Sequence, residues 1–474
     1  MVGITAYGAY IPWHRISRAD IAKMWEASAP SGEKAVASHD EDSLTMAVAA
    51  ARDCVKGIDP KSINGVYFAS TTSPYKEKQS AATIAAVIGT NDETNTVDFA
   101  NSLRGGMSAM RIAADVVRGG SAKNIMVCAS DMRLGHVNGE MEMAFGDGAA
   151  AVIVGDSKVI AEIEGYYTLY DDLIDTWRSD KDVFVRSWED RFIREEGYGR
   201  VVPKAVSASL KQYNLTPKDF SKAIFDAPDS RQLGTVAKTL GFDIKNQVQD
   251  SLYSVVGNTG TALAMMCLVA ALEEAKTGDR ILLTSYGSGC DVFIFKVTNE
   301  IENVAKRRAI KGHLESKQKL SYGKYLRWRE LVETEPPRRP PLEVPSAVAL
   351  WRDTSKGLRL CGVRCKRCGT PQYPAQRICV ICQAKDESEV YCFADKTGIV
   401  SAFSHDALAI SVDPPVTTTS VDFAEGGRIM CDMTDRDLMQ VKVGMPVEMT
   451  FRKLRYSGGI YDYWWKCQPV RGEI

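Results

Sequence analysis

The residues best suited to chemistry in this sequence are four cysteines arranged as two Cys-x-x-Cys pairs, Cys365 with Cys368 and Cys379 with Cys382. Each pair can bring two thiolates to one tetrahedral ion, so the spacing predicts a zinc ribbon. Because four thiolates fill the coordination shell and leave no position for water, we expect this zinc to stabilise the fold and not to catalyse a reaction. Cys361 lies outside the spacing of the pairs, and we expect it to be a free thiol.

A second stretch, residues 98–106, has the shape of a catalytic turn, and we call it the elbow. A short strand ending at Phe99 is predicted to run through a glycine-bearing turn into a helix of small residues and methionines that continues to about Val117. Such a turn presents one side chain at a helix N-terminus, where free N–H groups lower the pKa of a cysteine and favour its thiolate. The elbow contains no cysteine.

Several other strings accompany the elbow along the chain. They are Gly32-Glu33-Lys34 followed by His39-Asp40-Glu41-Asp42-Ser43, Phe145-Gly146-Asp147-Gly148-Ala149-Ala150, Gly257-Asn258-Thr259-Gly260 and Ser285-Tyr286-Gly287-Ser288-Gly289. Over about residues 1–300 these strings resemble the archaeal and bacterial branch of the 3-hydroxy-3-methylglutaryl-CoA synthases, within the thiolase superfamily. The resemblance implies a thiolase-like layered αβαβα fold of two similar halves and an enzyme that acts on a CoA thioester.

The resemblance also places the three groups of the family's mechanism, which are a Cys nucleophile, a Glu and a His. The Cys position, set by the glycine and alanine that follow it, is Leu103. The Glu position, in a string ending Ser-Pro-Tyr, is Thr71, and the His position, which precedes Ala-Pro, is Asp226. All three groups are changed. The Asn of the Gly-Asn-Thr-Gly turn is retained as Asn258, and its amide could polarise a carbonyl or orient a water.

The chemistry that remains possible favours an aldol-type reaction. Claisen condensation or thiolysis through an acyl-enzyme needs a nucleophile, whereas aldol or retro-aldol cleavage of a β-hydroxyacyl-CoA needs an acid/base group and a group that holds the enolate. Thiolase-fold aldolases of steroid side-chain breakdown are similar, since they lack the elbow cysteine, pair with a zinc-ribbon partner and are thought to use tyrosines. By this resemblance Tyr286 is the acid/base candidate and Asn258 holds the enolate. A phenol, with an ordinary pKa of about 10, would need a nearby positive charge or strong donor to act as a base.

Other assignments stay open from the sequence. Cys290 is a competing nucleophile, which would make the protein a thiolase or acyltransferase, although isolated cysteines are usually buried and inert. Asp226 could instead terminate a local turn. Ser102, beside the elbow position, has no His or Lys base visible in the sequence. A third reading, from a different class, is a non-catalytic CoA-binding scaffold subunit that stabilises another thiolase.

Composition excludes several function classes. The chain has 474 residues, 45% of them hydrophobic and 25% charged, which is typical of a globular protein of two or three domains. A formal net charge of -1 argues against a nucleic-acid surface or a polybasic membrane patch. No apolar run approaches the roughly 20 residues of a membrane span, and the N-terminus reads as a strand and not as a signal peptide. The twelve cysteines indicate a reducing, cytoplasmic compartment and not a disulfide framework.

Strand-like and helix-like patterns alternate over residues 1–160 and 161–300, which predicts two α/β halves. In the first half we expect strands at Val2–Tyr10, Gly65–Ala69, Asn124–Ala129 and Gly148–Val154 and helices at Asp42–Val55 and Ser80–Ile88. In the second half we expect helices at Arg200–Tyr213 and Gly260–Lys276 and strands at Lys222–Phe225, Asp279–Ser285 and Asp291–Val297.

The remaining residues predict a second body. A charged helix and a Pro-rich linker at 301–345 precede the zinc ribbon at 346–385 and a five-stranded OB-like barrel at 386–474, whose short strands are separated by Gly-Gly turns. Ribbon and barrel resemble acyl-CoA-associated proteins that usually bind thiolase-like enzymes as separate subunits, so the chain looks like a fusion whose second body helps to build or cover the acyl pocket. By the family resemblance we expect a homodimer, with a further thiolase-like subunit as a second candidate partner.

Overall fold

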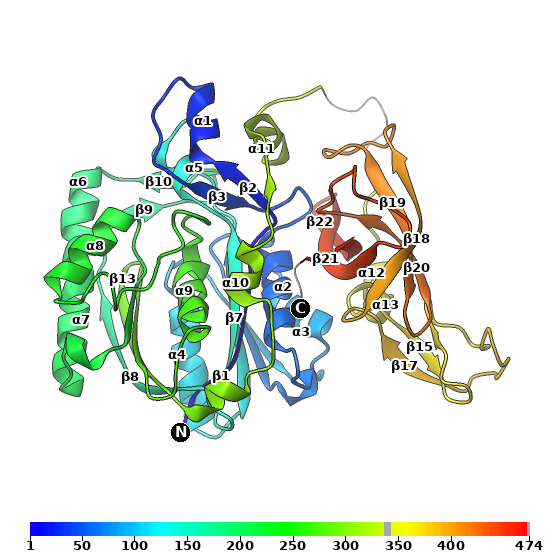
Figure 1. The fold of residues 1–474 in the computed structure, drawn as a ribbon, viewed down its shortest axis with the longest axis horizontal. Coiled ribbons are helices and arrows are strands. Elements are labelled where there is room, and N and C mark those ends of the chain that lie inside the picture. The colour runs from blue at the N-terminus through cyan, green and yellow to red at the C-terminus, as the bar shows by residue number, and fades with distance from the viewer. Residues whose placement is uncertain (336–342, 472–474) are drawn as a thin grey trace.

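The computed structural model describes residues 1–335 and 343–471, so most of the predicted Pro-rich linker lies outside the described residues. An α/β body formed by the N-terminal two thirds of the chain lies beside a smaller β-rich body (Figure 1). None of the described helices has the length and apolar character needed to cross a bilayer.

The α/β body is organised around one mixed sheet with the strand order β11-β12-β13-β8-β1-β7-β6-β4-β5. The strands are β1 (Gly3–Tyr10), β4 (Gly65–Ala69), β5 (Asn95–Phe99), β6 (Asn124–Asp131), β7 (Gly148–Gly155), β8 (Ala161–Tyr170), β11 (Lys222–Phe225), β12 (Arg280–Tyr286) and β13 (Gly289–Val297). Strand β7 is buried along its whole length, and its run of alanines lets helices pack closely on both faces.

The sheet has two halves, β11-β12-β13-β8 and β1-β7-β6-β4-β5, and helices form three layers around them. Central helices α4 (Gly105–Arg118) and α9 (Leu263–Leu272) lie between the halves, α2 (Ser43–Cys54) and α3 (Ser80–Ile88) cover one outer face, and α7 (Gly199–Tyr213) and α8 (Ser230–Thr239) cover the other. All ten residues of α9 are buried, as expected for a helix that is apolar on every side. The αβαβα layering and the α/β halves are therefore confirmed.

Shorter elements complete the α/β body. They are β2 (His14–Ser17), β3 (Glu33–Val36), β14 (Gln318–Lys319), β9 (Thr176–Trp177), β10 (Arg186–Ser187), α1 (Arg18–Met24), α5 (Glu140–Ala144), α6 (Asp190–Phe192), α10 (Ala309–Leu314) and α11 (Tyr322–Trp328). The charged helix predicted ahead of the Pro-rich linker within 301–345 is instead broken into several elements. Strand β14 pairs with β2, and α11 buries Tyr322, Tyr325 and Trp328 against the α/β body of the same chain, because its aromatic face outweighs its charges.

The second body contains the predicted ribbon and barrel. Two short helices, α12 (Ala347–Arg352) and α13 (Thr354–Gly357), precede the ribbon strands β15 (Cys361–Cys365), β16 (Pro371–Gln372) and β17 (Ser388–Cys392). The closed barrel follows, in the order β18 (Thr397–Asp406), β19 (Val416–Phe423), β20 (Arg428–Met433), β22 (Ile460–Pro469) and β21 (Pro446–Ser457). The ribbon extends past residue 385, because β17 pairs with β15 and closes its small sheet.

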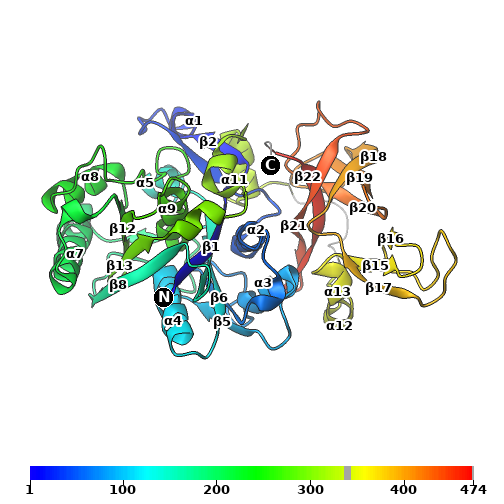
Figure 2. The same cartoon turned by 60° about the horizontal axis from the view of Figure 1, so that its bottom comes forward.

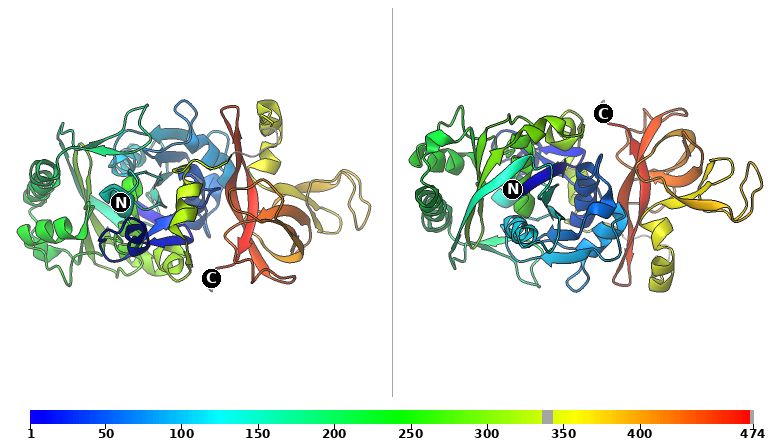
Figure 3. Two further views of the ribbon diagram at one scale, coloured as in Figure 1. Left: turned by 90° about the horizontal axis from the view of Figure 1, so that it is seen from above. Right: turned by 90° about the horizontal axis from the view of Figure 1, so that it is seen from below.

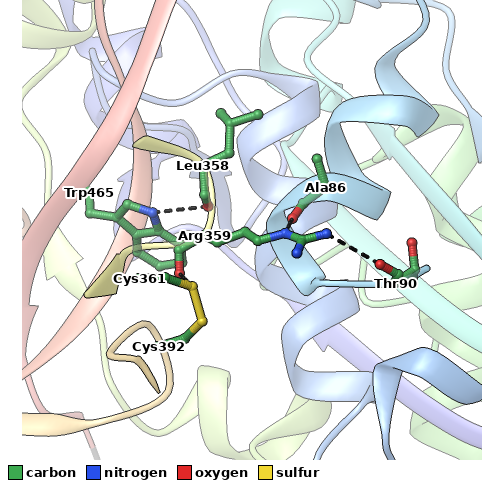
Figure 4. The surroundings of a disulfide bond; sticks show 7 residues. All are labelled: Ala86, Thr90, Leu358, Arg359, Cys361, Cys392 and Trp465. Carbon is green, nitrogen blue, oxygen red and sulfur yellow. Dashed lines mark hydrogen bonds between the residues drawn. A yellow bond between two sulfur atoms is a disulfide. The ribbon is translucent and has the colours of Figure 1, made fainter. Parts of the chain in front are cut away.

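A disulfide bond joins Cys361 on β15 to Cys392 on β17 (Figure 4). The two residues are direct cross-strand partners with Cα atoms 3.9 Å apart. The prediction that Cys361 is a free thiol is therefore wrong, because pairing of the two strands places a second cysteine opposite it. The other ten cysteines are not in disulfides.

The two bodies share one continuous core. Strands β21 and β22 lie alongside α2 and α3 in each view (Figures 2 and 3), and one apolar cluster runs from α2 into the barrel, where it includes the fully buried Trp465. The Trp465 indole donates to the carbonyl oxygen of Leu358 at 3.1 Å. The adjacent Arg359 donates to the carbonyl oxygens of Ala86 and Thr90, at and just beyond α3 (Figure 4). The second body is thus packed against the α/β body.

Candidate functional site

The elbow connects β5 to α4 and carries Leu103 at its tip. Asn101 has a φ of +66°, which makes the tight turn before the helix. The Arg104 guanidinium then ties the elbow to the turn between β12 and β13, because its Nε donates to the Gly287 carbonyl at 2.8 Å and its Nη1 pairs with Asp291 Oδ1 at 2.8 Å. Gly287 allows this close approach, since a Cβ there would make a tight contact of 3.1 Å with the Cβ of Leu103.

A cavity of about 160 Å³ lies against the elbow. Segments from the elbow, the loop after β4, the end of β6, the hairpin β9–β10 and the turn between β12 and β13 converge on it. Its lining residues are Thr71, Asn101, Ser102, Leu103, Arg133, Asp175, Thr176, Trp177, Arg178, Val185, Tyr286, Gly287 and Ser288. The lining therefore contains two of the predicted site residues and Leu103, but no cysteine, histidine or lysine from the part of the chain that the structure describes.

Tyr286 reaches the cavity from the end of β12. Its hydroxyl donates to Asp175 Oδ2 at 2.7 Å, and it packs against Gly197 in the π-helical turn Ile193–Tyr198. Burial raises the pKa of Tyr286, and the neighbouring Asp175 raises it further. The structure thus supplies a carboxylate where the sequence argument required a positive charge or donor. Tyr286 stays protonated, and the pair is suited to relaying a proton and not to providing a standing phenolate.

Thr71 lies in the loop after β4 and faces the same cavity. Its backbone N–H donates to Asp131 Oδ1 at 2.7 Å, which holds the loop in place. Asp131 is fully buried and accepts four further hydrogen bonds, from Ser70, Thr72 and both the N–H and hydroxyl of Thr261. The Thr71 hydroxyl itself is buried and has no hydrogen-bond partner among the described residues. It is therefore an unsatisfied buried donor at the cavity wall, a group that a bound ligand can satisfy.

Asp226 lies behind the cavity lining, and Asn258 adjoins the lining beside Arg133. Asp226 Oδ2 accepts a hydrogen bond from the Ser285 hydroxyl at 3.0 Å, and burial raises the pKa of Asp226 to about 7. Asn258 Oδ1 accepts from Arg133 Nη2 at 2.7 Å and from the Gly260 N–H at 3.0 Å. Two donors on one oxygen fix the orientation of this amide, so its NH₂ group is the part left for other partners.

Arg133 is the functional candidate that sequence reasoning missed. It is 7% exposed, lines the cavity and stacks over the Phe145 ring at 4.1 Å. The sequence held one signal for it, a charged residue just past the apolar strand β6. Strand β6 runs parallel to β4, and β4 runs parallel to β5, which leads into the elbow. Arg133 connects the cavity to Asn258.

Cys290 and Ser102 have poor surroundings for a nucleophile. Cys290 is completely buried in an apolar cluster that includes Tyr198 and Val292, does not line the cavity, and has its thiol pKa raised by burial. Ser102 lines the cavity, but its hydroxyl donates to the Gly287 carbonyl at 3.4 Å and has no imidazole or amine beside it in the described lining. Neither residue has an activating base.

The four ribbon cysteines form a cluster that can hold a metal ion. All four sulfur atoms lie within 4.8 Å of one another, with Cys365 and Cys382 3.6 Å apart and Cys368 and Cys379 3.5 Å apart. Sulfurs at about 2.3 Å from a tetrahedral zinc lie roughly 3.8 Å from one another, so the donor set and its spacing fit that ion.

Comparison with known families divides the chain as its fold does. Residues 97–167 match the family described as 3-oxoacyl-[acyl-carrier-protein] synthase III, and residues 210–295 match the C-terminal part of that synthase. Residues 394–452 match the C-terminal OB-fold domain of ChsH2. The prediction of a thiolase-like body fused to an OB barrel is confirmed.

Individual relatives agree with this division. A hydroxymethylglutaryl-CoA synthase of Methanopyrus kandleri is 34% identical over 344 residues, covering 70% of this chain and 98% of the relative. One from Thermococcus gammatolerans is 36% identical over 338 residues, covering 69% of this chain and 96% of the relative.

Solved structures share the fold of the first body. An HMG-CoA synthase complexed with CoA has a TM-score of 0.63 at 18% identity, covering 68% of this chain and 89% of that one. The 3-oxoacyl-[acyl-carrier-protein] synthase III from Aquifex aeolicus VF5 has a TM-score of 0.55 at 21% identity, covering 62% of this chain and 100% of that one.

Proposed function

The chain belongs to the hydroxymethylglutaryl-CoA synthase family, and from this membership we propose that it makes or breaks a carbon–carbon bond of a CoA thioester by an aldol-type reaction. Leu103 carries the proposal. At the tip of the elbow, against the cavity, the chain has a hydrocarbon side chain, and no sulfur lines the described cavity. The acyl group therefore stays on CoA during the reaction.

In the cleavage direction the substrate is a β-hydroxyacyl-CoA. Tyr286 takes the proton of the β-hydroxyl group while it passes its own proton to Asp175, which accepts its hydrogen bond at 2.7 Å. The Cα–Cβ bond breaks, its electron pair moves into the thioester as an enolate, and the hydroxyl carbon becomes a carbonyl. Asp175 then returns the proton through Tyr286 to the α-carbon. The protein ends unchanged, and the reverse sequence is aldol addition.

The other predicted residues have supporting roles in this proposal. Asn258 presents its amide NH₂ to the enolate oxygen, because both donors on its Oδ1 leave that group available. Thr71 donates its unpartnered hydroxyl to an oxygen of the acyl group. Asp226, behind the lining, adjusts the local charge through Arg133.

The test is turnover of β-hydroxyacyl-CoA thioesters with two readouts, carbonyl product and intact protein mass. We expect cleavage with no acyl adduct, and a rate at least about 100-fold lower in Tyr286→Phe. Cys290→Ala is the matched control and should retain activity, because that thiol is buried away from the cavity. A covalent acyl-enzyme, or activity lost in Cys290→Ala and retained in Tyr286→Phe, would favour acyl transfer. No turnover and co-purification with a cysteine-bearing homologue would favour the scaffold subunit.

We further propose that zinc fills the cysteine cluster and stabilises the ribbon. Four thiolates complete its coordination, so its contribution is to hold β15 and the following loop together. None of the described cavity residues comes from the barrel, but the Tyr461 N–H donates to the Tyr75 hydroxyl at 2.7 Å, in the loop that carries Thr71. The barrel thus supports the pocket from outside. The homodimer, a second thiolase-like partner and a cytoplasmic location stay predictions.

A further inference from the structure

Arg133 is a buried cation that forms no ion pair within the part of the chain that the structure describes. Its side chain is 7% exposed, its Nε has no hydrogen-bond partner, and no carboxylate lies within 4.0 Å of its guanidinium among the residues that the structure describes. Removing a charge from water is costly unless an opposite charge compensates it, typically by several kcal/mol. Burial accordingly lowers the pKa of Arg133. The buried guanidinium without an ion pair indicates that the negatively charged partner of Arg133 belongs to the bound ligand.

The nearby carboxylates do not supply that partner. Asp131 uses its oxygens for five hydrogen bonds from the loop after β4 and from Thr261, so its charge offsets the burial of Arg133 only in part and no ion pair forms between them. Asp226 is held by the Ser285 hydroxyl, and with its pKa raised to about 7 it carries only part of a charge at neutral pH. Asp175, the acid in the cavity lining, accepts from Tyr286. The lining contains two arginines and one aspartate, so it has an excess of positive charge.

The position of Arg133 is fixed from two sides. Its Nη2 donates to Asn258 Oδ1 at 2.7 Å, and its guanidinium lies 4.1 Å from the centroid of the Phe145 ring. Gly260 is needed beside it, since a Cβ there would lie 2.8 Å from Arg133 Nε and 2.4 Å from Asp131 Oδ2. A preorganised buried cation interacts strongly with charge that develops next to it.

We propose that Arg133 is the electrostatic catalyst of this site, supplying the positive charge that stabilises the enolate oxygen of the bound acyl-CoA thioester and orienting the Asn258 amide toward it. The inference rests on the proposed function in one respect, that the ligand is an acyl-CoA thioester. When the α-carbon loses a proton or a carbon substituent, the electron pair moves to the thioester oxygen, which becomes the ion-pair partner that Arg133 lacks. The substrate class is therefore a thioester that passes through an enolate, whatever the electrophile.

The experiment is exchange of the α-hydrogens of acetyl-CoA and propionyl-CoA for deuterium in D₂O, followed by mass spectrometry with the full-length chain. We expect wild-type protein to catalyse exchange and Arg133→Gln to slow it by about 100-fold or more, mainly in kcat. Arg133→Lys should retain part of the rate because it keeps the charge. Arg111→Gln is the matched control, since Arg111 also stacks on an aromatic ring, Tyr166, at 4.2 Å but lies outside the cavity. Equal exchange by wild type and a folded Arg133→Gln overturns the proposal.

A second measurement on the wild-type chain covers the case in which Arg133→Gln does not fold. A CoA analogue bearing a nitronate anion in place of the thioester enolate should bind at least about 100-fold more tightly than its neutral ketone analogue. Equal binding of the two analogues overturns the proposal, and so does a preference for acyl chains with a terminal carboxylate that disappears in Arg133→Gln while exchange persists. Deuterium exchange that depends on Arg133 without any aldol cleavage would contradict the proposed function and support the role of Arg133. Aldol cleavage with exchange independent of Arg133 would do the reverse.

Discussion

Replacing Gly197 with alanine is expected to uncouple Tyr286 from Asp175. A Cβ at Gly197 would lie 2.6 Å from the Tyr286 hydroxyl oxygen, and relief to an ordinary contact of about 3.5 Å requires a shift of about 0.9 Å. The hydroxyl donates to Asp175 at 2.7 Å, so a shift of that size away from the carboxylate takes the bond past hydrogen-bonding range. If this bond relays the proton, α-deuterium exchange should fall by about 100-fold.

Stability measurements isolate the same contact. Overpacking costs about 1–3 kcal/mol in the free energy of unfolding. The new Cβ at residue 197 would also lie 3.2 Å from Leu173 Cδ2, a second tight contact. In a Tyr286→Phe background the contact with Leu173 remains, but the nearest ring atom of residue 286 is then 3.6 Å from the new Cβ. Gly197→Ala should therefore cost at least about 1 kcal/mol less in that background.

Denaturant unfolding of wild type, Gly197→Ala, Tyr286→Phe and the double variant gives this double-mutant cycle, and deuterium exchange measures their activity. Gly234→Ala in α8 is the matched glycine control, because a Cβ there meets no atom within 4 Å. It should leave both readouts near wild type or slightly raise stability. Equal costs of Gly197→Ala in the two backgrounds, or full exchange activity in Gly197→Ala, would refute the geometry of the Tyr286–Asp175 relay.

Three further outcomes are expected. Leu103→Cys should form a covalent acyl adduct with acyl-CoA, visible by intact mass, because the new thiol lies at the N-terminus of α4 and faces the cavity; an unmodified protein would show that the elbow does not meet the thioester. Cys365→Ser should release bound zinc, measured by elemental analysis, and lower the unfolding temperature of the ribbon while exchange activity survives. Folding raises the pKa of Asp226 from 3.8 to about 7, so the folded chain favours the protonated carboxyl. The contribution of this carboxyl to the free energy of unfolding is therefore full below about pH 4 and is lost as the pH rises through 7. Asp226→Asn should therefore gain up to about 4 kcal/mol over wild type between pH 4 and pH 8 in denaturant unfolding, and a difference that does not change with pH would contradict the raised pKa.

The sequence alone predicted the features that depend on residues close together along the chain. The spacing of Cys365, Cys368, Cys379 and Cys382 predicted a metal cluster because each pair acts within one short turn. The elbow was visible because a strand, a tight turn and a helix follow one another directly, and Leu103 stands where that turn presents its side chain.

Contacts between distant segments were not visible in the same way. The disulfide of Cys361 depends on a strand 31 residues away. The pKa of Tyr286 is raised first by burial and then by Asp175, which is 111 residues away. Asp175 reaches the cavity only because β8 and β13 pair and bring the following loop beside Tyr286.

By itself the sequence determined the two-body architecture, the cysteine cluster and the absence of a thiol at the elbow, since each follows from residue types at short spacing. Only the tertiary structure decided which polar groups surround the cavity. It placed Arg133 against Asn258, put a carboxylate on the Tyr286 hydroxyl and enclosed Cys290 among apolar side chains. The physical reason is that burial and neighbouring charge determine the reactivity of a side chain, and both are properties of folded segments that are far apart along the chain.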